Sequence, residues 1–202
     1  MAAREVLDPD RTTIHRTRAG SSVADHLSRV ADLLREVDSE AVASLVYALE
    51  AARGAGRTVF TLGNGGSAAT ALHLANDLAA TARPGRPPLK VVCLNANVSL
   101  FSCLANDFGY DQVFVRQLAP LLAPEDVVFG ISASGDSENC VNALSFARRR
   151  GAVTAGLLGF DGGRMKALCD HAVHVPCNDY LSVEDVHLAV CHALARALRD
   201  GL

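Results

Sequence analysis

The sequence predicts one α/β domain in which helices flank a doubly wound, five-stranded parallel sheet. Short aliphatic runs that resemble buried strands alternate along the chain with segments of helical periodicity, which is the pattern of βαβ units. Half of the 202 residues are hydrophobic but only 5% are aromatic, and this aliphatic excess is typical of a parallel sheet covered on both faces. A chain of this length can also bury the core of a single domain.

Five strands and three of the helices that cover them can be assigned in order. The strands are expected at residues 58–62, 89–94, 126–131, 153–158 and 171–175. Helices are expected at residues 67–81, from 138 to 150, and at 182–198. Ligands of such sheets bind beyond the carboxyl ends of the strands, so a site is expected in the loops that follow the strands.

Two further helices are expected before the first strand. Residues 1–21 lack sustained periodicity and are expected to form a flexible N-terminal leader, so the domain is expected to span residues 22–202. Apolar stripes at helical spacing then follow: Val23, Leu27, Val30 and Leu34, and after them Val42, Leu45, Val46 and Leu49. These stripes suit packing on the sheet, on each other or on another subunit.

Charge and cysteine usage exclude several classes of function. The net charge of −3 leaves no basic stripe to neutralise phosphates, so no nucleic acid is expected as a partner. The six cysteines lack the close spacing of a zinc knuckle or a redox motif, and they are expected to be reduced and structural. The sequence shows no apolar leader segment and no membrane-spanning stretch, so no membrane partner is expected and the cytoplasm is the expected location.

The first candidate site is the glycine-rich turn at residues 63–67. Its glycines permit positive φ and a close approach of a ligand, and the helix that follows offers free N–H groups to an anion. The turn matches neither the dinucleotide fingerprint nor the Walker A loop, since no lysine follows it. By itself it is equally well an ordinary tight connection.

The second candidate site is a serine-rich loop after the third expected strand. Ser132, Ser134 and Ser137 surround Gly135 just before a helix. Their hydroxyls and the helix N–H groups are suitable ligands for a phosphate, and the helix dipole favours a nearby anion by roughly 0.3–1 kcal/mol. Helix capping explains one such residue, either Ser134 or Asp136, but not three hydroxyls and a glycine. The loop therefore predicts a phosphate site.

Four motifs together resemble a known family. They are L-G-N-G-G-S at 62–67, A-N-D-F-G at 105–109, I-S-A-S-G-D-S at 131–137 and D-G-G-R-M at 161–165. In order and spacing they are similar to those of SIS (sugar isomerase) domains, and most similar to the phosphoheptose isomerases. The resemblance implies an SIS fold and the conversion of sedoheptulose 7-phosphate to D-glycero-D-manno-heptose 7-phosphate, which feeds heptose biosynthesis. It also implies a homotetramer with sites at subunit interfaces.

The resemblance also implies which residues bind the sugar phosphate. They are Asn64, Gly65, Gly66 and Ser67 in the turn, Asn106 and Asp107 further along, Ser132, Ala133, Ser134 and Ser137 in the serine loop, and Glu184. Family members commonly carry threonine where this chain has Ala133, and the backbone N–H at that position can still bind a phosphate.

A zinc site is implied at His73, Asp77, Glu184 and His192, with Asp77 and His192 as the proton-transfer pair. Asp77 stands where relatives usually carry glutamate, and Glu184 where they usually carry glutamine. His73 and Asp77 are four residues apart and share a helix face, while Glu184 and His192 lie on the closing helix. By ligand type this set suits zinc, although the spacing alone leaves Asp77 equally explained as an exposed helix residue.

The two departures from the family pattern leave alternatives open. They either compensate each other or mark an isomerase of another sugar phosphate, such as arabinose 5-phosphate. A further alternative is a non-catalytic SIS protein that binds sugar phosphates or associates with the replication initiator DnaA. The retention of His73, an acid at position 77 and His192 favours the enzyme.

Overall fold

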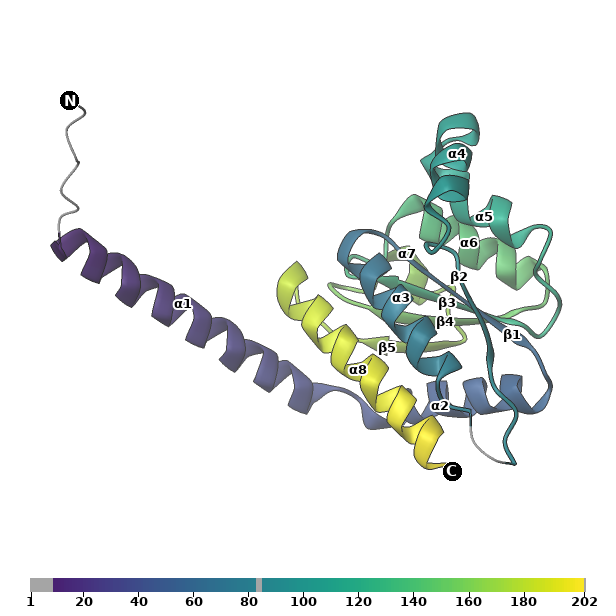
Figure 1. Ribbon diagram of the computed structural model, residues 1–202, viewed down its shortest axis with the longest axis horizontal. Coiled ribbons are helices and arrows are strands. Elements are labelled where there is room, and N and C mark those ends of the chain that lie inside the picture. The colour runs from purple at the N-terminus through teal and green to yellow at the C-terminus, as the bar shows by residue number, and fades with distance from the viewer. Residues whose placement is uncertain (1–8, 83–84, 202) are drawn as a thin grey trace. The chain divides into compact units, whose positions relative to one another are not determined.

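The computed structural model describes residues 9–82 and 85–201 and contains one five-stranded parallel sheet (Figure 1). The strands are β1 (Thr58–Gly63), β2 (Lys90–Cys93), β3 (Val127–Ser132), β4 (Val153–Leu158) and β5 (His171–His174). Their order in the sheet is β2-β1-β3-β4-β5, and all neighbours pair in parallel. The predicted five-stranded parallel sheet is therefore confirmed.

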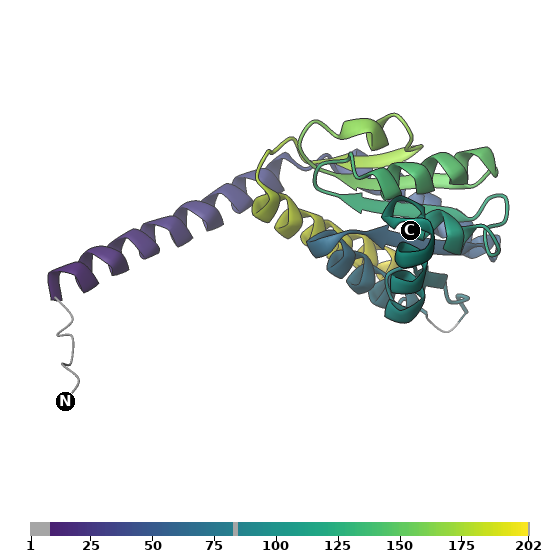
Figure 2. The ribbon, with the colours of Figure 1, turned by 90° about the horizontal axis from the view of Figure 1, so that it is seen from above.

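Helices cover both faces of this sheet (Figure 2). The helical elements are α1 (Pro9–Glu36), α2 (Ser39–Gly54), α3 (Gly65–Ala79), α4 (Val98–Phe108), η1 (Tyr110–Gln112), α5 (Val113–Leu118), α6 (Glu138–Arg149), α7 (Gly163–Lys166) and α8 (Tyr180–Asp200). One layer contains α2, α3 and α8, and the other contains α5, α6 and α7. Because both faces are covered, all six residues of β3 are buried, as expected for a central parallel strand.

The strand order reverses direction between β1 and β3, which is the feature of the fold that positions a site. From β1 the chain crosses to β2 on one side, and from β3 it crosses to β4 and β5 on the other. At this switch point Gly63 pairs with Ile131, so the turn after β1 and the serine loop after β3 leave the sheet side by side. Open α/β sheets bind their ligands in this crevice.

The first helix is longer than the sequence predicted. α1 begins at Pro9 rather than near Ser22, so it crosses the expected boundary between leader and domain. Proline suits the first turn of a helix because its missing N–H has no partner there. The chain divides into two compact units, residues 1–36 and residues 37–202.

Three elements between β2 and β3 were missed by the sequence analysis. No helix was assigned between residues 95 and 125, where the structure has α4, η1 and α5. The apolar spacing of α4 offered a helical signal that was not used, whereas η1 and α5 are too short to show a helical period. Asn97 nevertheless caps α4 by accepting a hydrogen bond from the N–H of Leu100 at 3.0 Å.

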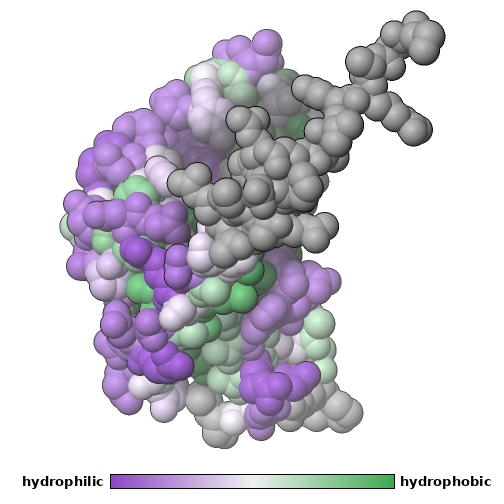
Figure 3. Space-filling model, turned by 90° about the vertical axis from the view of Figure 1, so that its left-hand side faces the viewer, coloured by the Kyte–Doolittle hydropathy of each residue, from purple (hydrophilic) through white to green (hydrophobic). Residues whose placement is uncertain are grey.

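The core of the domain is apolar, as the composition predicts. Its largest fully buried side chains include Phe60, Phe114 and Phe129. All six cysteines lie in the described part of the chain and none forms a disulfide. On the face drawn in Figure 3, hydrophobic residues show between more extensive hydrophilic ones. Among the described helices, none combines the length and apolar character needed to cross a bilayer.

Candidate active site

The turn between β1 and α3 leaves the start of the helix open to a ligand. Asn64 occupies the N-cap position with φ −120° and ψ 151°, yet in the described structure its side chain makes no capping hydrogen bond. Gly65, which opens α3, has a φ of +53°, a conformation that favours glycine. The N–H groups of the first turn of α3 are consequently available to an anion.

The serine loop is held in shape by its own hydroxyls. The Oγ of Ser132 accepts a hydrogen bond from the N–H of Gly135 at 3.0 Å, and that of Ser134 accepts one from Asp136 at 3.3 Å. Ser137 is the N-cap of α6 but, within the described residues, makes no capping bond through its side chain. The N–H groups at the start of α6 are therefore available to a ligand, beside those at the start of α3.

The D-G-G-R-M segment at residues 161–165 packs against the serine loop. Gly135 has a φ of +65°, and a Cβ added there would lie 2.0 Å from the carbonyl oxygen of Gly162. Arg164 pairs through Nε with Asp136 at 2.5 Å and through a terminal nitrogen with Glu138 at 2.9 Å. The hydrogen bond from Arg164 lowers the pKa of Asp136, which keeps this carboxylate ionised and the ion pair formed.

A small polar pocket of about 120 Å³ joins the two loops. It is lined by Asn64, Ser67, Ile131, Ser132, Ala133, Ser134, Ser137, Tyr180 and Glu184. The structure thus brings together the serine loop, two residues of the glycine turn and Glu184, although these are far apart in sequence. The size and polarity of the pocket suit a phosphate group.

A second pocket of about 240 Å³ lies on the other side of Asn64. It is lined by Gly63, Asn64, Gly65, Ala68, Leu72, Asn95, Val98, Phe101 and Tyr110. Asn106 and Asp107, expected to contact the sugar, line neither pocket and are exposed near the end of α4. Asn106 donates to Asp107 at 2.8 Å, and this hydrogen bond lowers the pKa of the aspartate.

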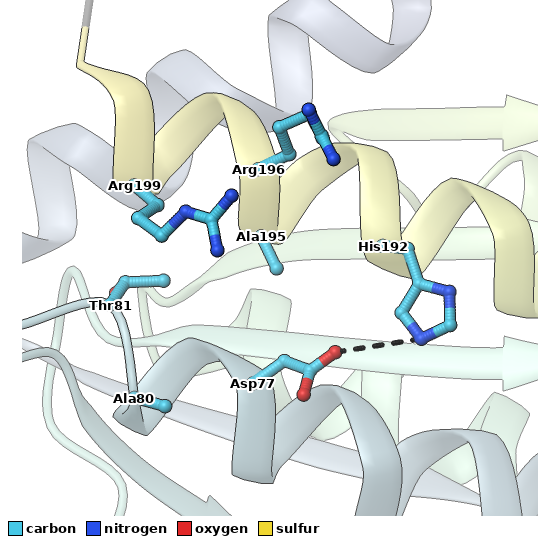
Figure 4. Close-up of a pocket in the computed structure, with 7 residues that line it drawn as sticks. All are labelled: Asp77, Ala80, Thr81, His192, Ala195, Arg196 and Arg199. Atoms are coloured by element: carbon cyan, nitrogen blue, oxygen red, sulfur yellow. Dashed lines mark ion pairs between the residues drawn. The ribbon is translucent and has the colours of Figure 1, made fainter.

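Three of the four predicted metal ligands converge between α3 and α8. The Nε2 atoms of His73 and His192 are 2.8 Å apart, and Oδ2 of Asp77 lies 3.2 Å from the first and 3.8 Å from the second. Figure 4 shows Asp77 and His192 facing each other from the two helices. Helical spacing puts His73 and Asp77 on one face, and the packing of α3 on α8 brings His192 to them.

Glu184, the fourth predicted ligand, is not part of this cluster. Its carboxylate lies against Gly66, where an added Cβ would be 2.1 Å from Oε2. It therefore borders the phosphate-sized pocket rather than the two histidines. Partial burial, with a smaller contribution from Asp185, raises the pKa of Glu184 above its ordinary value.

The three clustered residues fit a zinc ion by donor type and by spacing. Two imidazole nitrogens and a carboxylate oxygen are the donor set of many catalytic zinc sites, which keep one position open. Ligands bonded at about 2.0–2.1 Å in a tetrahedron are about 3.3 Å from one another. The separations of 2.8, 3.2 and 3.8 Å observed here bracket that value.

A larger pocket of about 280 Å³ continues from this cluster toward the ends of the two helices (Figure 4). It is lined by Asp77, Ala80, Thr81, His192, Ala195, Arg196 and Arg199. His192, Arg196 and Arg199 are four and then three residues apart, so they share one face of α8. Two guanidinium groups therefore give this side of the cluster a positive potential.

Several residues of this region were missed by the sequence analysis. Helical spacing from His192 offered a signal for Arg196 and Arg199. Tyr110 and Tyr180 carried no such signal, because they reach the pockets through tertiary packing that no local pattern encodes.

Comparison with known proteins identifies the family. A family model described as SIS domain matches residues 23–159. The phosphoheptose isomerase of Trichlorobacter lovleyi is 39% identical over 178 residues, which cover 88% of this chain and 90% of that protein. The chain belongs to the phosphoheptose isomerase family of SIS-domain proteins. The phosphoheptose isomerase of Geotalea daltonii is 36% identical over 182 residues, covering 90% and 94% of the two chains.

Solved structures of phosphoheptose isomerases share the fold. That from Neisseria gonorrhoeae superposes with a TM-score of 0.83 at 26% identity and covers 92% of this chain and 99% of its own. That from Francisella tularensis also gives a TM-score of 0.83, at 24% identity, and covers 93% and 99% of the two chains. The SIS architecture expected from the four motifs is therefore confirmed as that of the phosphoheptose isomerase family.

Proposed function

We propose that this protein is an aldose–ketose isomerase that converts sedoheptulose 7-phosphate to D-glycero-D-manno-heptose 7-phosphate, the first step toward activated heptoses. The observation that carries the proposal is the placement of two sites along one pair of helices. A phosphate-sized pocket lies where α3 and α8 begin, and a His/Asp cluster lies further along the same two helices. The names of the curated relatives support the same reaction.

The phosphate is held by the two open helix starts. Ser132, Ser134 and Ser137 supply hydroxyls, and the first turns of α3 and α6 supply N–H groups and favourable dipoles. The sugar chain then extends from the phosphate along α3 and α8 toward the His/Asp cluster. Glu184 lies at the start of that path and is placed to accept a hydrogen bond from a sugar hydroxyl.

The reaction moves one proton between two carbons and one between two oxygens, so it needs no external oxidant or reductant. Asp77 takes the proton from C1 of the ketose to give an enediol and returns it to C2. His192 protonates the oxygen at C2 and receives the proton of the hydroxyl at C1, and with zinc held by its Nε2 this role falls to its other ring nitrogen, Nδ1. General acid–base groups typically supply about 10²–10⁴-fold each.

Zinc, when bound, would polarise the sugar carbonyl and stabilise developing negative charge on its oxygen. His73, Asp77 and His192 are the residues that would hold it. Ligation by Glu184 as well is part of the proposal and requires its side chain to turn from Gly66 toward the histidines. Arg196 and Arg199, which line the pocket beside Asp77 and His192, add positive potential there.

The most direct test is NMR of the purified protein with sedoheptulose 7-phosphate. Formation of the heptose 7-phosphate that is lost with a chelator and restored by added zinc supports the proposal. Arabinose 5-phosphate serves as the rival substrate under the same conditions, and preferential turnover of that sugar would contradict the heptose assignment. Binding of sugar phosphate without turnover of either substrate would instead support a non-catalytic SIS protein.

Metal content tests the zinc site separately. The wild-type protein is expected to hold about one zinc per subunit, and His192→Ala is expected to lose it. His187→Ala is not a suitable control because His187 is fully buried. His26→Ala, on α1, is the matched control and is expected to retain the metal. Equal zinc in all three proteins would contradict the site.

The proposal extends to assembly and location. The resemblance to the phosphoheptose isomerases and the apolar stripe of α1 support a homotetramer. The six cysteines form no disulfide in the described part of the chain, and this supports a reducing compartment, for which the cytoplasm is the proposed location.

A further inference from the structure

The side chain of Asn64 is hydrogen-bonded to two residues that lie outside the four motifs. Asn64 and Asn139 form a reciprocal amide pair, with N–H···O distances of 2.8 Å in one direction and 2.9 Å in the other. The phenol of Tyr110 donates to the same Oδ1 of Asn64 at 2.9 Å. The three residues come from the ends of three different connections, and they meet between the two pockets that flank Asn64.

These bonds occupy the hydrogen-bonding capacity of the Asn64 carboxamide. Its oxygen has two lone pairs, one used by Asn139 and one by Tyr110. One N–H is donated to Asn139, and Nδ2 also lies 3.9 Å from the sulfur of Cys140. Burial raises the pKa of Cys140 to about 12, so this sulfur remains a thiol and a weak acceptor.

Asn64 is for this reason an asparagine at an N-cap that does not cap. Asparagine in this position ordinarily accepts a hydrogen bond from the second or third N–H of its helix. Asp38, Asn97 and Asp179 do so for α2, α4 and α8 of this chain. The carboxamide of Asn64 is instead held away, and the N–H groups of Gly66 and Ser67 are left for a ligand.

Contacts with neighbouring residues restrict the side chains of both partners, Asn139 and Tyr110. Asn139 is only 2% exposed, and its oxygen also accepts from the backbone N–H of Cys140 at 2.9 Å. The ring of Tyr110 packs edge-on against Phe101, with centroids 5.8 Å apart, and Phe101 packs in turn against the buried Phe114 at 5.7 Å. The amide is therefore fixed by the hydrophobic core on one side and by a buried side chain on the other.

We propose that Asn139 and Tyr110 are positioning residues that keep the Asn64 carboxamide off the start of α3, so that its N–H groups bind the substrate phosphate. This inference rests on the proposed function, because it assigns those N–H groups to the phosphate. Without its partners, the Asn64 side chain rotates and caps its own helix. The cap then competes with the phosphate, and affinity falls although no phosphate-binding group has been removed.

The test compares two variants with matched controls. Asn139→Ala is expected to raise the Kd for inorganic phosphate and the KM for sedoheptulose 7-phosphate at least tenfold, with kcat changed less than threefold. Tyr110→Phe, which removes one of the two bonds to Oδ1, is expected to raise them about threefold. Asn142→Ala, one turn along α6 and bonded to the carbonyl of Asp111 instead, controls for loss of a partly buried amide. Tyr47→Phe, on α2 and exposed, controls for loss of a phenol.

A rescue separates competition from simple structural damage. Adding Asn64→Gly to Asn139→Ala removes the side chain that caps the helix, and the Kd of the double variant for inorganic phosphate is expected to fall to that of Asn64→Gly alone. A purely structural role for Asn139 predicts that the second change gives no recovery. The melting temperature of each variant reports folding independently of binding.

The outcomes distinguish the two proposals. If the wild type binds neither inorganic phosphate nor the sugar phosphate, the proposed function fails. If the wild type binds both and Asn139→Ala binds them equally well, the positioning role alone is overturned. In the wild type, the Asn64 side-chain amide protons are also expected to exchange more slowly with solvent than in Asn139→Ala, a readout that needs no ligand.

Discussion

Asp77 is the residue on which the proposed chemistry depends most. One of its carboxylate oxygens faces both imidazoles of the cluster, and its side chain is 21% exposed. An aspartate is one methylene shorter than a glutamate, yet in this structure it reaches both rings. The shorter acid can therefore serve the cluster without help from Glu184.

Asp77→Asn is accordingly expected to reduce kcat by at least about 10²-fold. An amide of the same size keeps the packing between α3 and α8 but cannot accept the substrate proton. Phosphate affinity is expected to be unchanged, since Asp77 does not line the phosphate-sized pocket. Steady-state kinetics and phosphate calorimetry measure the two effects. Asp77→Glu is the conservative control, and turnover by the asparagine variant equal to either acid would remove Asp77 from the mechanism.

At the residue scale, sequence reasoning succeeded where a local pattern carried the information. The pair His73 and Asp77 follows from helical spacing, and the serine loop from three hydroxyls at one helix start. The positions of Glu184 and Asn139 depend on how distant helices pack, and no spacing reveals that. The family resemblance implied that Glu184 joins the histidines, whereas the structure places its carboxylate over Gly66.

At the scale of single elements, the serine loop depends on one glycine. Gly135 combines a positive φ with the backbone of Gly162 directly where a Cβ would lie. That obstacle is main chain rather than the end of a flexible side chain, so the loop itself must move. Any such movement displaces the hydroxyls of Ser132 and Ser134 from the pocket.

Gly135→Ala is expected to destabilise the fold by more than the roughly 1–2 kcal/mol that a left-handed alanine costs alone, and to weaken phosphate binding. Gly151→Ala is the matched control. Gly151 has a φ of +74°, but its Cβ would meet only a proline side chain at 3.7 Å, an ordinary contact. Denaturant unfolding measures the free energy of unfolding of both variants, and the difference between them gives the cost of the contact with Gly162. Equal loss of stability in both variants would show that the backbone of Gly162 moves away from the added Cβ at little cost in free energy.

Helix α8 carries a histidine, His187, that is expected to make the stability of the folded protein depend on pH. His187 is fully buried, and among the described residues neither ring nitrogen has a hydrogen-bond partner. Burial, with a smaller contribution from His174 and against an opposing contribution from the backbone of Leu158, lowers the pKa of His187 to about 4 from an ordinary 6.5. Between these two values the unfolded chain binds a proton that the folded chain does not.

The free energy of unfolding is therefore expected to fall as the pH falls from 6.5 toward 4, and this contribution to end below about 4. The sign follows from linkage, since protons bind the unfolded state more tightly in that window. Relative to His187→Leu, the wild type is expected to lose up to about 3 kcal/mol between pH 7 and pH 4. Urea unfolding of both proteins across this range measures the difference. Parallel pH profiles would mean that His187 is solvated or charged in the folded protein.

Strands and helices differed in how well the sequence predicted them. The five strands are short, aliphatic and bounded by polar turns, so their positions agree with the structure to within one or two residues. Among the elements between β2 and β3, η1 and α5 are only three and six residues long, too short for a helical period to show. The amphipathic pattern of α4 is as clear as that of α6, so there the signal was present and was not used.

At the scale of the molecule, topology explains why two weak motifs form one site. The glycine turn alone was equally well an ordinary connection, and the serine loop lies about 70 residues beyond it. The reversal of strand order between β1 and β3 sets them side by side. The two local motifs therefore predict a single site only when they are placed on the predicted fold.

Assembly is the last property of the whole molecule that can be tested by substitution. In α1, Val23 is 60% and Leu27 62% exposed, unusual values for apolar residues at helical spacing. In the proposed tetramer these side chains are buried between subunits, so a charge among them is expected to disrupt assembly. Leu27→Asp is expected to give a smaller particle than the wild type, whereas Ser28→Asp, the adjacent exposed position, carries the same substitution outside the stripe.

Light scattering measures the mass of each protein, and turnover reports the sites. Because the proposed sites lie at subunit interfaces, Leu27→Asp is also expected to lose activity in proportion to the loss of tetramer, while Ser28→Asp keeps both. A wild-type monomer would contradict the tetramer itself. A Leu27→Asp protein that remains tetrameric would show that the stripe of α1 is not what joins the subunits.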